Sequence, residues 1–291
     1  MRRRMARASR IVKNVIGYGM RVMGPVLVLL GAAIIATVVY VHFTVILPYH
    51  VRDAGLGWLL FHLALDALLM TKIAAHYTLA VFTAPGQPKE DDLTPEEVDE
   101  LRQWGMDGWC NKCNLPKPAR THHCSYCNRC VLAFDHHCPW IANCVGFHNY
   151  KHFVFFVAST WAGCLYIVLM SLPAMMSSPS ELWGPGEERT HVIFCFIIGI
   201  ALLVALGVLL IWHIYLSMTA QTTVEFYLNT RFDDQTSQNL FDLGSWRKNV
   251  IMAFGDPGWM GSCWIFHPLG GGPRPGDGIT WRIQPTLGHF L

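Results

Sequence analysis

The sequence has few charged residues. Aspartate, glutamate, lysine and arginine make up only 14% of its 291 residues, whereas hydrophobic residues make up 52%. An ordinary soluble domain carries about 25% charged residues. This shortage argues against a soluble globular protein. The net charge of +2 says little by itself, so its distribution along the chain has to be examined.

Acidic residues are absent from residues 1–21, which hold seven basic ones. This composition predicts a disordered, basic N-terminal tail that sets membrane topology and touches anionic lipid. Because an apolar span follows directly, we expect membrane lipids rather than nucleic acid as the partner of the tail.

Four apolar segments are long enough to cross a bilayer core of about 30 Å. We predict membrane helices over residues 22–47, 57–82, 153–176 and 192–216. The expected fold class is an all-α polytopic membrane protein with four transmembrane helices. The expected domains are 1–21, the N-terminal tail; 22–82, helices 1 and 2; 83–152, a linker helix and a cysteine-rich zinc domain; 153–216, helices 3 and 4; and 217–291, a C-terminal region with a flexible tail.

Basic residues are also scarce in two of the predicted loops. The loop 48–56 holds only Arg52, and the loop 177–190 holds only Arg189. The N-terminal tail holds seven basic residues, and the region between the second and third helices also holds seven. Because cytoplasmic segments carry the excess of basic residues, we expect both termini and the cysteine-rich domain to be cytosolic.

The second predicted helix carries four ionisable residues, which are costly at membrane depth. They form two pairs at i,i+4 spacing, His62 with Asp66 and Lys72 with His76. Residues at this spacing share a helix face. The pairs suggest structural pairing inside the bundle, with ion or proton passage as the alternative.

Two short helices are predicted outside the membrane. In the linker, Thr94 and Glu97 form a capping box for a helix that Gly105 ends. In the C-terminal region, Ser245 can cap a helix over 246–253, which Gly255 ends.

The stretch 110–144 contains seven of the ten cysteines and four of the fourteen histidines. Two frames of the form C-x2-C-x9-H-x6-C overlap in it, shifted by fourteen residues. Each frame supplies three thiolates and one imidazole, which is a complete tetrahedral set for a structural zinc ion. The predicted ligands are Cys110, Cys113, His123 and Cys130 for one ion, and Cys124, Cys127, His137 and Cys144 for the other.

A third copy of the frame begins at Cys138, but the residues that follow cannot complete it. Its other positions are Ile141, Lys151 and Ala158. Cys138 is therefore left over, with one histidine of each His-His pair. The repeat does not decide which histidine of a pair binds metal. A spare cysteine next to a histidine and an aspartate is either inert or an activated nucleophile.

The run Asp135-His136-His137-Cys138-Pro139-Trp140 resembles the motif of the DHHC-type protein S-acyltransferases, also called palmitoyltransferases. Further matches are Cys144-Val145-Gly146, Asn149-Tyr150, Thr222-Thr223-Val224-Glu225, and Asn249 before Phe254-Gly255. The similarity covers about residues 20–255. One departure occurs at Thr83-Ala84-Pro85-Gly86, where Ala84 replaces the aspartate of a D-P-G element.

The resemblance implies an enzyme that transfers a long-chain acyl group, such as palmitate, from acyl-CoA to its own Cys138. The group then passes to cysteines of membrane-associated proteins. His136 would take the thiol proton, and Asp135 would support the imidazole. The two zinc ions would be structural. We expect an endomembrane location, in the Golgi or endoplasmic reticulum, and we expect Thr222, Thr223, Glu225 and Asn249 to support the active site.

The acyl chain is expected between the membrane helices. One face of the third helix carries Phe153, Phe156, Thr160 and Gly163. Trp140 could lie at the entrance to this acyl-chain site. Gly163 leaves room for longer chains. Lys117, Arg120 and Arg129 are either contacts for CoA phosphates or solvated residues. Cys263 is either inert or a lipid attachment site.

Two other functions are compatible with parts of the sequence. A membrane-anchored zinc adaptor would explain the frames but not the left-over Asp-His-x-Cys group. A metal transporter would combine cysteine and histidine with membrane spans, but its ligands should lie within the spans.

Overall fold

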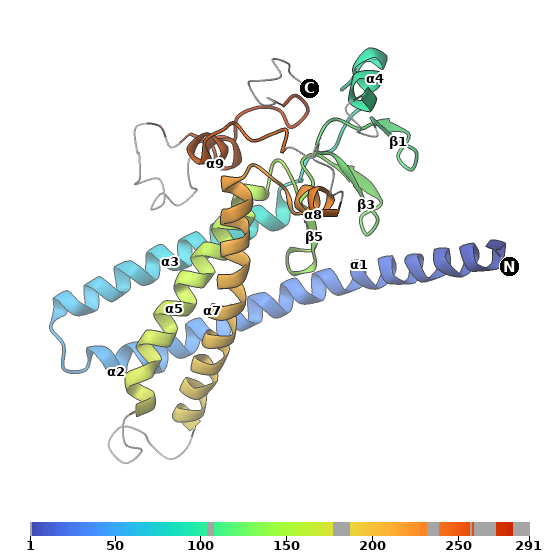
Figure 1. The fold of residues 1–291 in the computed structure, drawn as a ribbon. Helices are drawn as coiled ribbons and strands as arrows, with labels where there is room; N and C mark the ends of the chain where they lie inside the picture. The colour runs from blue at the N-terminus through green and yellow to red at the C-terminus, as the bar shows by residue number, and fades with distance from the viewer. Residues whose placement is uncertain are drawn as a thin grey trace. The chain divides into compact units, whose positions relative to one another are not determined.

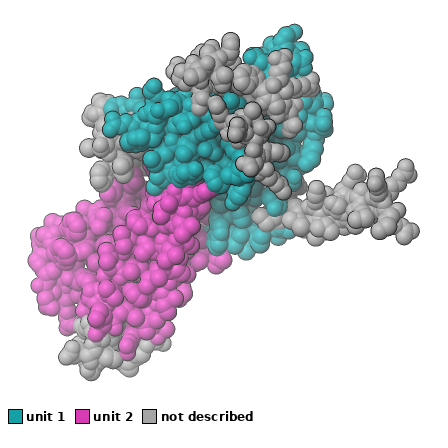
Figure 2. All heavy atoms as spheres, in the orientation of Figure 1, with its two compact units in different colours: residues 1–28, 78–153, 214–291 teal, residues 29–77, 154–213 magenta. Residues whose placement is uncertain are grey.

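The computed structural model describes residues 2–103, 108–176, 187–231, 239–256, 258 and 272–281. The chain divides into two compact units, coloured separately in Figure 2. Unit 1 comprises Met1–Val28, Thr78–Phe153 and Ile214–Leu291. Unit 2 comprises Leu29–Tyr77 and Val154–His213.

Among the described residues, four helical segments are long and apolar enough to cross a membrane (Figure 1). They are Val22–Val51, Leu56–Phe82, Tyr150–Met176 and Arg189–Met218. The first includes the second half of α1 (Arg2–Val41), and the others correspond to α3 (Leu56–Phe82), α5 (Tyr150–Met176) and α7 (Glu187–Met218). The predicted polytopic helical fold is confirmed. Most of the predicted loop 177–190 lies outside the described residues.

The N-terminal segment differs from the prediction. A disordered tail was expected in residues 1–21, but α1 already begins at Arg2. The physical reason is helix cooperativity: starting a helix is costly, whereas extending one adds a hydrogen bond for each residue fixed. Arginine, alanine and methionine, which are common in this segment, are good helix formers. The membrane span therefore provides a nucleus from which the helix extends.

The first span also continues beyond its predicted end. A π-helical turn, η1 (His42–Ile46), follows α1 and leads into α2 (Leu47–Val51). Pro48 does not end the helix because it lies in the first turn of α2, where the missing N–H costs little.

Within unit 2, the predicted pairing of His62 with Asp66 is wrong. Asp66 pairs with His42 at 3.0 Å rather than with His62, and His62 Nδ1 lies 2.7 Å from the Tyr166 hydroxyl. Lys72 and His76 both contact the Phe155 ring. For His62 and Asp66, the i,i+4 rule did not give the partners, which come from other helices.

The cysteine-rich segment of unit 1 folds into three short antiparallel hairpins. They are β1–β2 (Trp109–Cys110, Leu115–Pro116), β3–β4 (His122–Cys124, Arg129–Val131) and β5–β6 (His136–Cys138, Asn143–Val145). Their registers repeat at fourteen-residue intervals, so that Cys110 faces Leu115, Cys124 faces Arg129 and Cys138 faces Asn143. The third copy of the sequence frame is therefore also a third copy of the structure.

The hairpin turns contain left-handed residues at matching positions, namely Asn114, Asn128 and Ala142, with φ of 53°, 53° and 49°. Asparagine tolerates this conformation better than most residues. Ala142 adopts it without that advantage, which indicates that the surrounding contacts hold the third turn in the shape of the other two.

The described parts of unit 1 also contain three short α-helices, α4 (Pro95–Gln103), α8 (Thr223–Arg231) and α9 (Trp246–Phe254), and a 3-10 turn, η2 (Pro139–Ile141). The predicted capping box of α4 is confirmed by reciprocal bonds, since Thr94 N–H donates to Glu97 and Glu97 N–H donates to the Thr94 hydroxyl. Ser245 precedes α9 and Gly255 follows it, as predicted, but the Ser245 side chain forms no capping hydrogen bond. Gly105 lies outside the described residues.

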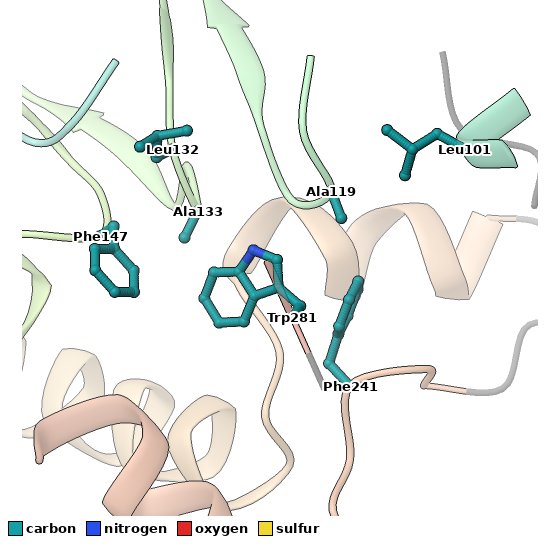
Figure 3. Close-up of a cluster of buried hydrophobic side chains, with 7 residues drawn as sticks. All are labelled: Leu101, Ala119, Leu132, Ala133, Phe147, Phe241 and Trp281. Carbon is teal, nitrogen blue, oxygen red and sulfur yellow. The ribbon is translucent and has the colours of Figure 1, made fainter. Parts of the chain in front are cut away.

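A hydrophobic core joins the cysteine-rich segment to the C-terminal part of unit 1 (Figure 3). Trp281 lies within this cluster, and its ring contacts those of Phe147 and Phe241 edge-on, at 5.7 and 6.2 Å between centroids. Gly278 packs so closely on Phe147 that a Cβ there would lie 2.7 Å from the ring. Segment 272–281 is thus part of the core of unit 1.

Replacing Trp281 with alanine should destabilise unit 1. The side chain is 3% exposed, and deleting a buried tryptophan costs about 3–5 kcal/mol. The thermal unfolding midpoint of the detergent-purified chain should fall clearly. The control is Tyr227→Ala, which truncates an aromatic residue that is 63% exposed and should change stability by less than about 0.5 kcal/mol. Equal midpoints for the two variants would contradict this role of Trp281.

Candidate active site and metal clusters

Two groups of cysteine and histidine side chains match the predicted metal frames residue for residue. The first contains Cys110, Cys113, His123 and Cys130, and the second contains Cys124, Cys127, His137 and Cys144. In each group the potential ligand atoms lie within 4.8 Å of one another. The second histidine of each His-His pair therefore belongs to a cluster, which resolves the choice that the repeat left open.

The distances within the clusters fit a tetrahedral zinc ion. Zinc bonds of about 2.3 Å to sulfur and about 2.0–2.1 Å to nitrogen place neighbouring ligands about 3.5–3.8 Å apart. His123 Nδ1 lies 3.2 Å from Cys113 Sγ and 3.7 Å from Cys110 Sγ. His137 Nδ1 lies 3.3 Å from Cys127 Sγ and 3.6 Å from Cys144 Sγ.

The electrostatics of the second cluster also favour a cation. Hydrogen bonds to Cys124 and Cys127 raise the pKa of His137 to about 9. The sulfur atoms of Cys124 and Cys127 thus attract a proton to the imidazole. A metal ion bound by thiolates and a neutral imidazole would take the place of that proton.

Cys138 lies outside both clusters. In the hairpin register it occupies the position that the ligands Cys110 and Cys124 hold in the first two hairpins. The position of the second ligand is taken by Ile141, which is buried. Cys138 is therefore placed like the first ligand of a third cluster, but the other ligands of such a cluster are missing. His137 and Cys144 of the same hairpin belong to the second cluster.

The neighbours of Cys138 are Asp135 and His136. His136 Nδ1 lies 2.7 Å from Asp135 Oδ2. Burial lowers the pKa of His136, but hydrogen bonds and charge from Asp135 and Cys138 outweigh burial and raise it to about 9. Its ring also packs edge-on against Phe153, at 5.0 Å between centroids. The structure thus brings all three predicted catalytic residues together.

The orientation of Asp135 depends on the start of α8. The Thr223 N–H donates to Asp135 Oδ1 and the Thr223 hydroxyl donates to Asp135 Oδ2, both at 2.9 Å. The carboxylate thus lies at a helix N-terminus, where negative charge is favoured. Thr222 and Glu225 form a reciprocal capping box in the same turn. The predicted supporting role of these residues therefore has a definite geometry.

Arg120 is neither a solvated residue nor a contact for CoA phosphate, the two alternatives that the sequence left open. It is buried and forms two bonds of 2.7 Å with Glu225. Its guanidinium group also stacks on Phe241 and Trp281, at 4.6 and 4.5 Å. The charge of Arg120 is therefore used inside unit 1, where it connects the core to α8.

Sequence reasoning did not identify the residues that attach the third hairpin to the end of α3. The amide of Asn143 donates to the carbonyls of Val81 and Thr83, at 3.2 and 2.9 Å. The amide of Asn149 donates to the Cys144 carbonyl at 2.8 Å. The last carbonyls of a helix lack intrahelical partners, so these amides cap α3 as they fix the hairpin.

The segment around Ala84 is also held through its backbone. Leu132 N–H donates to the Gly86 carbonyl, and His148 N–H donates to the Pro85 carbonyl, both at 3.2 Å. Pro85 also approaches Gly146 so closely that a Cβ on Gly146 would lie 2.9 Å from the Pro85 oxygen. These contacts do not involve the side chain at position 84, which is exposed.

The residues predicted to contact the acyl chain are divided between the units. Trp140 is half-exposed and Phe153 is buried, both in unit 1. In unit 2, Phe156 packs against Tyr77 at 4.8 Å between ring centroids. Gly163 lines a cavity of about 100 Å³ within unit 2.

The family model that matches the chain is the DHHC palmitoyltransferase model, over residues 105–230. This range contains both clusters, the Asp135–His136 pair and the start of α8. It extends from just before the first hairpin to the end of α8.

Curated relatives show the same likeness. Probable protein S-acyltransferase 16 of Arabidopsis thaliana is 36% identical over 216 residues, which cover 68% of this chain and 74% of the relative. Palmitoyltransferase ZDHHC20-A of Danio rerio is 38% identical over 56% of this chain and 46% of the relative. Palmitoyltransferase ZDHHC16A of Danio rerio is 27% identical over 91% of this chain and 80% of the relative. The chain therefore belongs to the DHHC palmitoyltransferase family of protein S-acyltransferases.

Proposed function

We propose that this chain catalyses protein S-acylation in two steps, with Cys138 as the residue that carries the acyl group. The donor is a long-chain acyl-CoA such as palmitoyl-CoA, and the acceptors are cysteines of membrane-associated proteins. One observation carries the proposal. Of the seven cysteines between Cys110 and Cys144, Cys138 alone lies outside the two clusters, and it lies beside the bonded Asp135–His136 pair.

In the first step, His136 takes the proton of the Cys138 thiol. Asp135 occupies Nδ1 of the ring, which leaves Nε2 as the proton acceptor, as in other triads. A positively charged imidazole favours the thiolate, which is the attacking species. The Cys138 sulfur bonds to the acyl carbon, the bond from that carbon to the CoA sulfur breaks, and His136 returns its proton to the departing CoA thiolate.

In the second step, the acceptor cysteine gives its proton to His136 and attacks the acyl group on Cys138. The bond between the acyl carbon and Cys138 breaks, and Cys138 recovers the proton. One thioester is exchanged for another in each step, so the driving force is small and the product bond stays labile.

We infer that the two clusters hold structural zinc ions. When bound, each ion would cross-link a segment too small to build its own core. With four protein ligands each, the clusters leave no open position for a reacting group. The first cluster would join the first hairpin to the second, and the second cluster, through His137 and Cys144, would join the second hairpin to the third.

The acyl chain, in this proposal, runs along the face of α5 that carries Phe153, Phe156 and Gly163, with Trp140 at its entrance. The packing of Phe153 on His136 supports this, since it puts an apolar ring beside the proposed proton acceptor. The cavity at Gly163 supports it as well. The proposed location is an endomembrane of the Golgi or endoplasmic reticulum, with the active site and both termini cytosolic.

The variant Cys138→Ser should abolish acyl-enzyme formation. We expect no hydroxylamine-sensitive label from radioactive palmitoyl-CoA, while zinc content stays at two ions per chain. Intact-protein mass spectrometry and elemental analysis measure both. As a matched control, Cys130→Ser should lose zinc. Loss of zinc from Cys138→Ser would make this residue a ligand and contradict the proposal.

The variant Thr223→Val should slow acylation of Cys138 by about tenfold, because a hydrogen bond to a charged group is worth about 1.5–3 kcal/mol. Thr223→Ser keeps the hydroxyl and should restore most of the rate. Single-turnover labelling measures both. Equal rates in the two variants would show that the hydroxyl bond to Asp135 does not contribute.

The variant Gly163→Leu should shift donor preference toward shorter chains. Even a Cβ at this position would lie 3.3 Å from Ile73 Cδ1, so a larger side chain must occupy the cavity. Each buried methylene contributes about 0.8 kcal/mol. Excluding two should therefore lower the rate with stearoyl-CoA relative to myristoyl-CoA by about tenfold. An unchanged profile of chain lengths would remove the cavity from the proposed path.

A further inference from the structure

A small cavity within unit 1 has two arginine side chains in its wall. Its volume is about 20 Å³, and Arg120 and Arg274 line it together with Thr222. The lining residues that the structure describes all belong to unit 1, and none of them is acidic. The wall therefore carries positive charge without a carboxylate of its own.

The charge of Arg120 is already balanced. Its guanidinium group donates two hydrogen bonds of 2.7 Å to the Glu225 carboxylate and one of 2.9 Å to the Ala220 carbonyl. Such a bidentate pair of arginine and carboxylate is among the stronger polar contacts in proteins. Arg120 and Glu225 together thus add little net charge to the cavity.

Arg274 has no comparable partner. Its Nε donates to the Met252 carbonyl at 3.0 Å, and its Nη1 donates to the Phe147 carbonyl at 3.2 Å. Both acceptors are neutral, and no ion pair joins Arg274 to a carboxylate of the described residues. An arginine has five N–H donors. In the described parts of the chain, the Nη2 atom of Arg274 has no acceptor, and it is not sealed off from solvent.

The surroundings of Arg274 make its charge costly. The side chain is mostly buried. Burial and the charge of Arg120 lower the pKa of Arg274 to about 9, so the group is still charged at neutral pH. The carboxylates of Glu225 and Asp135 attract it, but each is bonded to another side chain. Because buried charges in proteins are normally paired, the cavity beside Arg274 favours an anion.

A neutral donor lies in the same wall. Thr222 is 6% exposed, and its hydroxyl oxygen accepts the Glu225 N–H at 3.2 Å. A hydroxyl group donates one hydrogen bond in addition to those that it accepts. Within the described residues, the Thr222 hydroxyl donates to no acceptor. The wall thus offers both N–H and O–H donors to an anion.

The size of the cavity limits which anion can bind. A cavity needs about 10–15 Å³ to hold one water molecule, so a volume of about 20 Å³ admits a single particle little larger than water. Phosphate and carboxylate groups contain several heavy atoms and are too large. A halide ion is a single atom with one negative charge, which balances one guanidinium group. Chloride is the abundant halide of cells.

We propose that this cavity binds one chloride ion, which accepts hydrogen bonds from Arg274 Nη2 and the Thr222 hydroxyl. The ion balances the charge of Arg274. It also stabilises the start of α8, because Thr222 belongs to the capping box of this helix. Thr223 in the same turn holds Asp135. Chloride binding requires no acyl transfer, so it stands independently of the proposed function.

The test measures thermal unfolding of the full-length, zinc-loaded chain in detergent, with chloride exchanged for gluconate at constant ionic strength. Gluconate is too large for the cavity, so the two salts differ in binding but not in screening. A ligand that binds only the folded chain raises the unfolding midpoint. For a site of millimolar affinity, the rise at about 100 mM chloride should be about 3–10 °C. Bromide should act in the same way, and crystals grown in sodium bromide should show an anomalous-scattering peak beside Arg274.

The variant Arg274→Gln removes the charge and should abolish the rise in midpoint. The matched control is Arg247→Gln, which replaces an exposed arginine outside the cavity wall and should keep the rise. Equal midpoints in chloride and gluconate for the unmodified chain would overturn the inference, as would an unchanged rise in Arg274→Gln. If that variant does not fold, the bromide peak of the unmodified chain decides. A cavity without this peak would hold only water, and the inference would be wrong.

Discussion

The structure of the cysteine-rich segment depends on one constraint, the four ligands that each metal cluster requires. Two clusters use six of the seven cysteines and two of the four histidines between Cys110 and Cys144. The fourteen-residue repeat provides a third hairpin of the same register, which carries His137 and Cys144 of the second cluster but lacks the ligands for a third cluster. Cys138 thus occupies a ligand position but belongs to neither cluster. Next to it in the chain, His136 forms a hydrogen bond with Asp135.

A second set of contacts joins this hairpin to distant parts of the chain. Asn143 caps the end of α3, and Thr223 donates two hydrogen bonds to Asp135. Arg120 connects the capping box of α8 to the core around Trp281. Buried charges of this kind need partners with good geometry. The position of the His136 ring is therefore set by segments that are far apart in the sequence.

Features that depend on the spacing of residues along the chain were predicted correctly from the sequence. Predictions failed where a residue's interaction partner comes from a distant part of the chain. Cysteine spacing gave both clusters, and the Thr94–Glu97 pair gave the start of α4. Asp66 was paired with the wrong histidine, because i,i+4 spacing cannot report a partner on another helix such as His42. Arg120 was interpreted as solvated or phosphate-binding, because nothing local indicates that Glu225 lies beside it. The third hairpin was implicit in the repeat, but the left-handed Ala142 that completes it has no sequence signal.

The most direct test of this account is X-ray absorption spectroscopy at the zinc edge of the purified, zinc-loaded chain. Each chain should bind two zinc ions. Averaged over both ions, the coordination should be three sulfur ligands and one nitrogen ligand, because six cysteines and two histidines form the clusters. An average above three sulfur ligands would place Cys138 on a metal ion. That result would contradict the assignment of Cys138 as the free thiol on which the proposed acyl transfer depends.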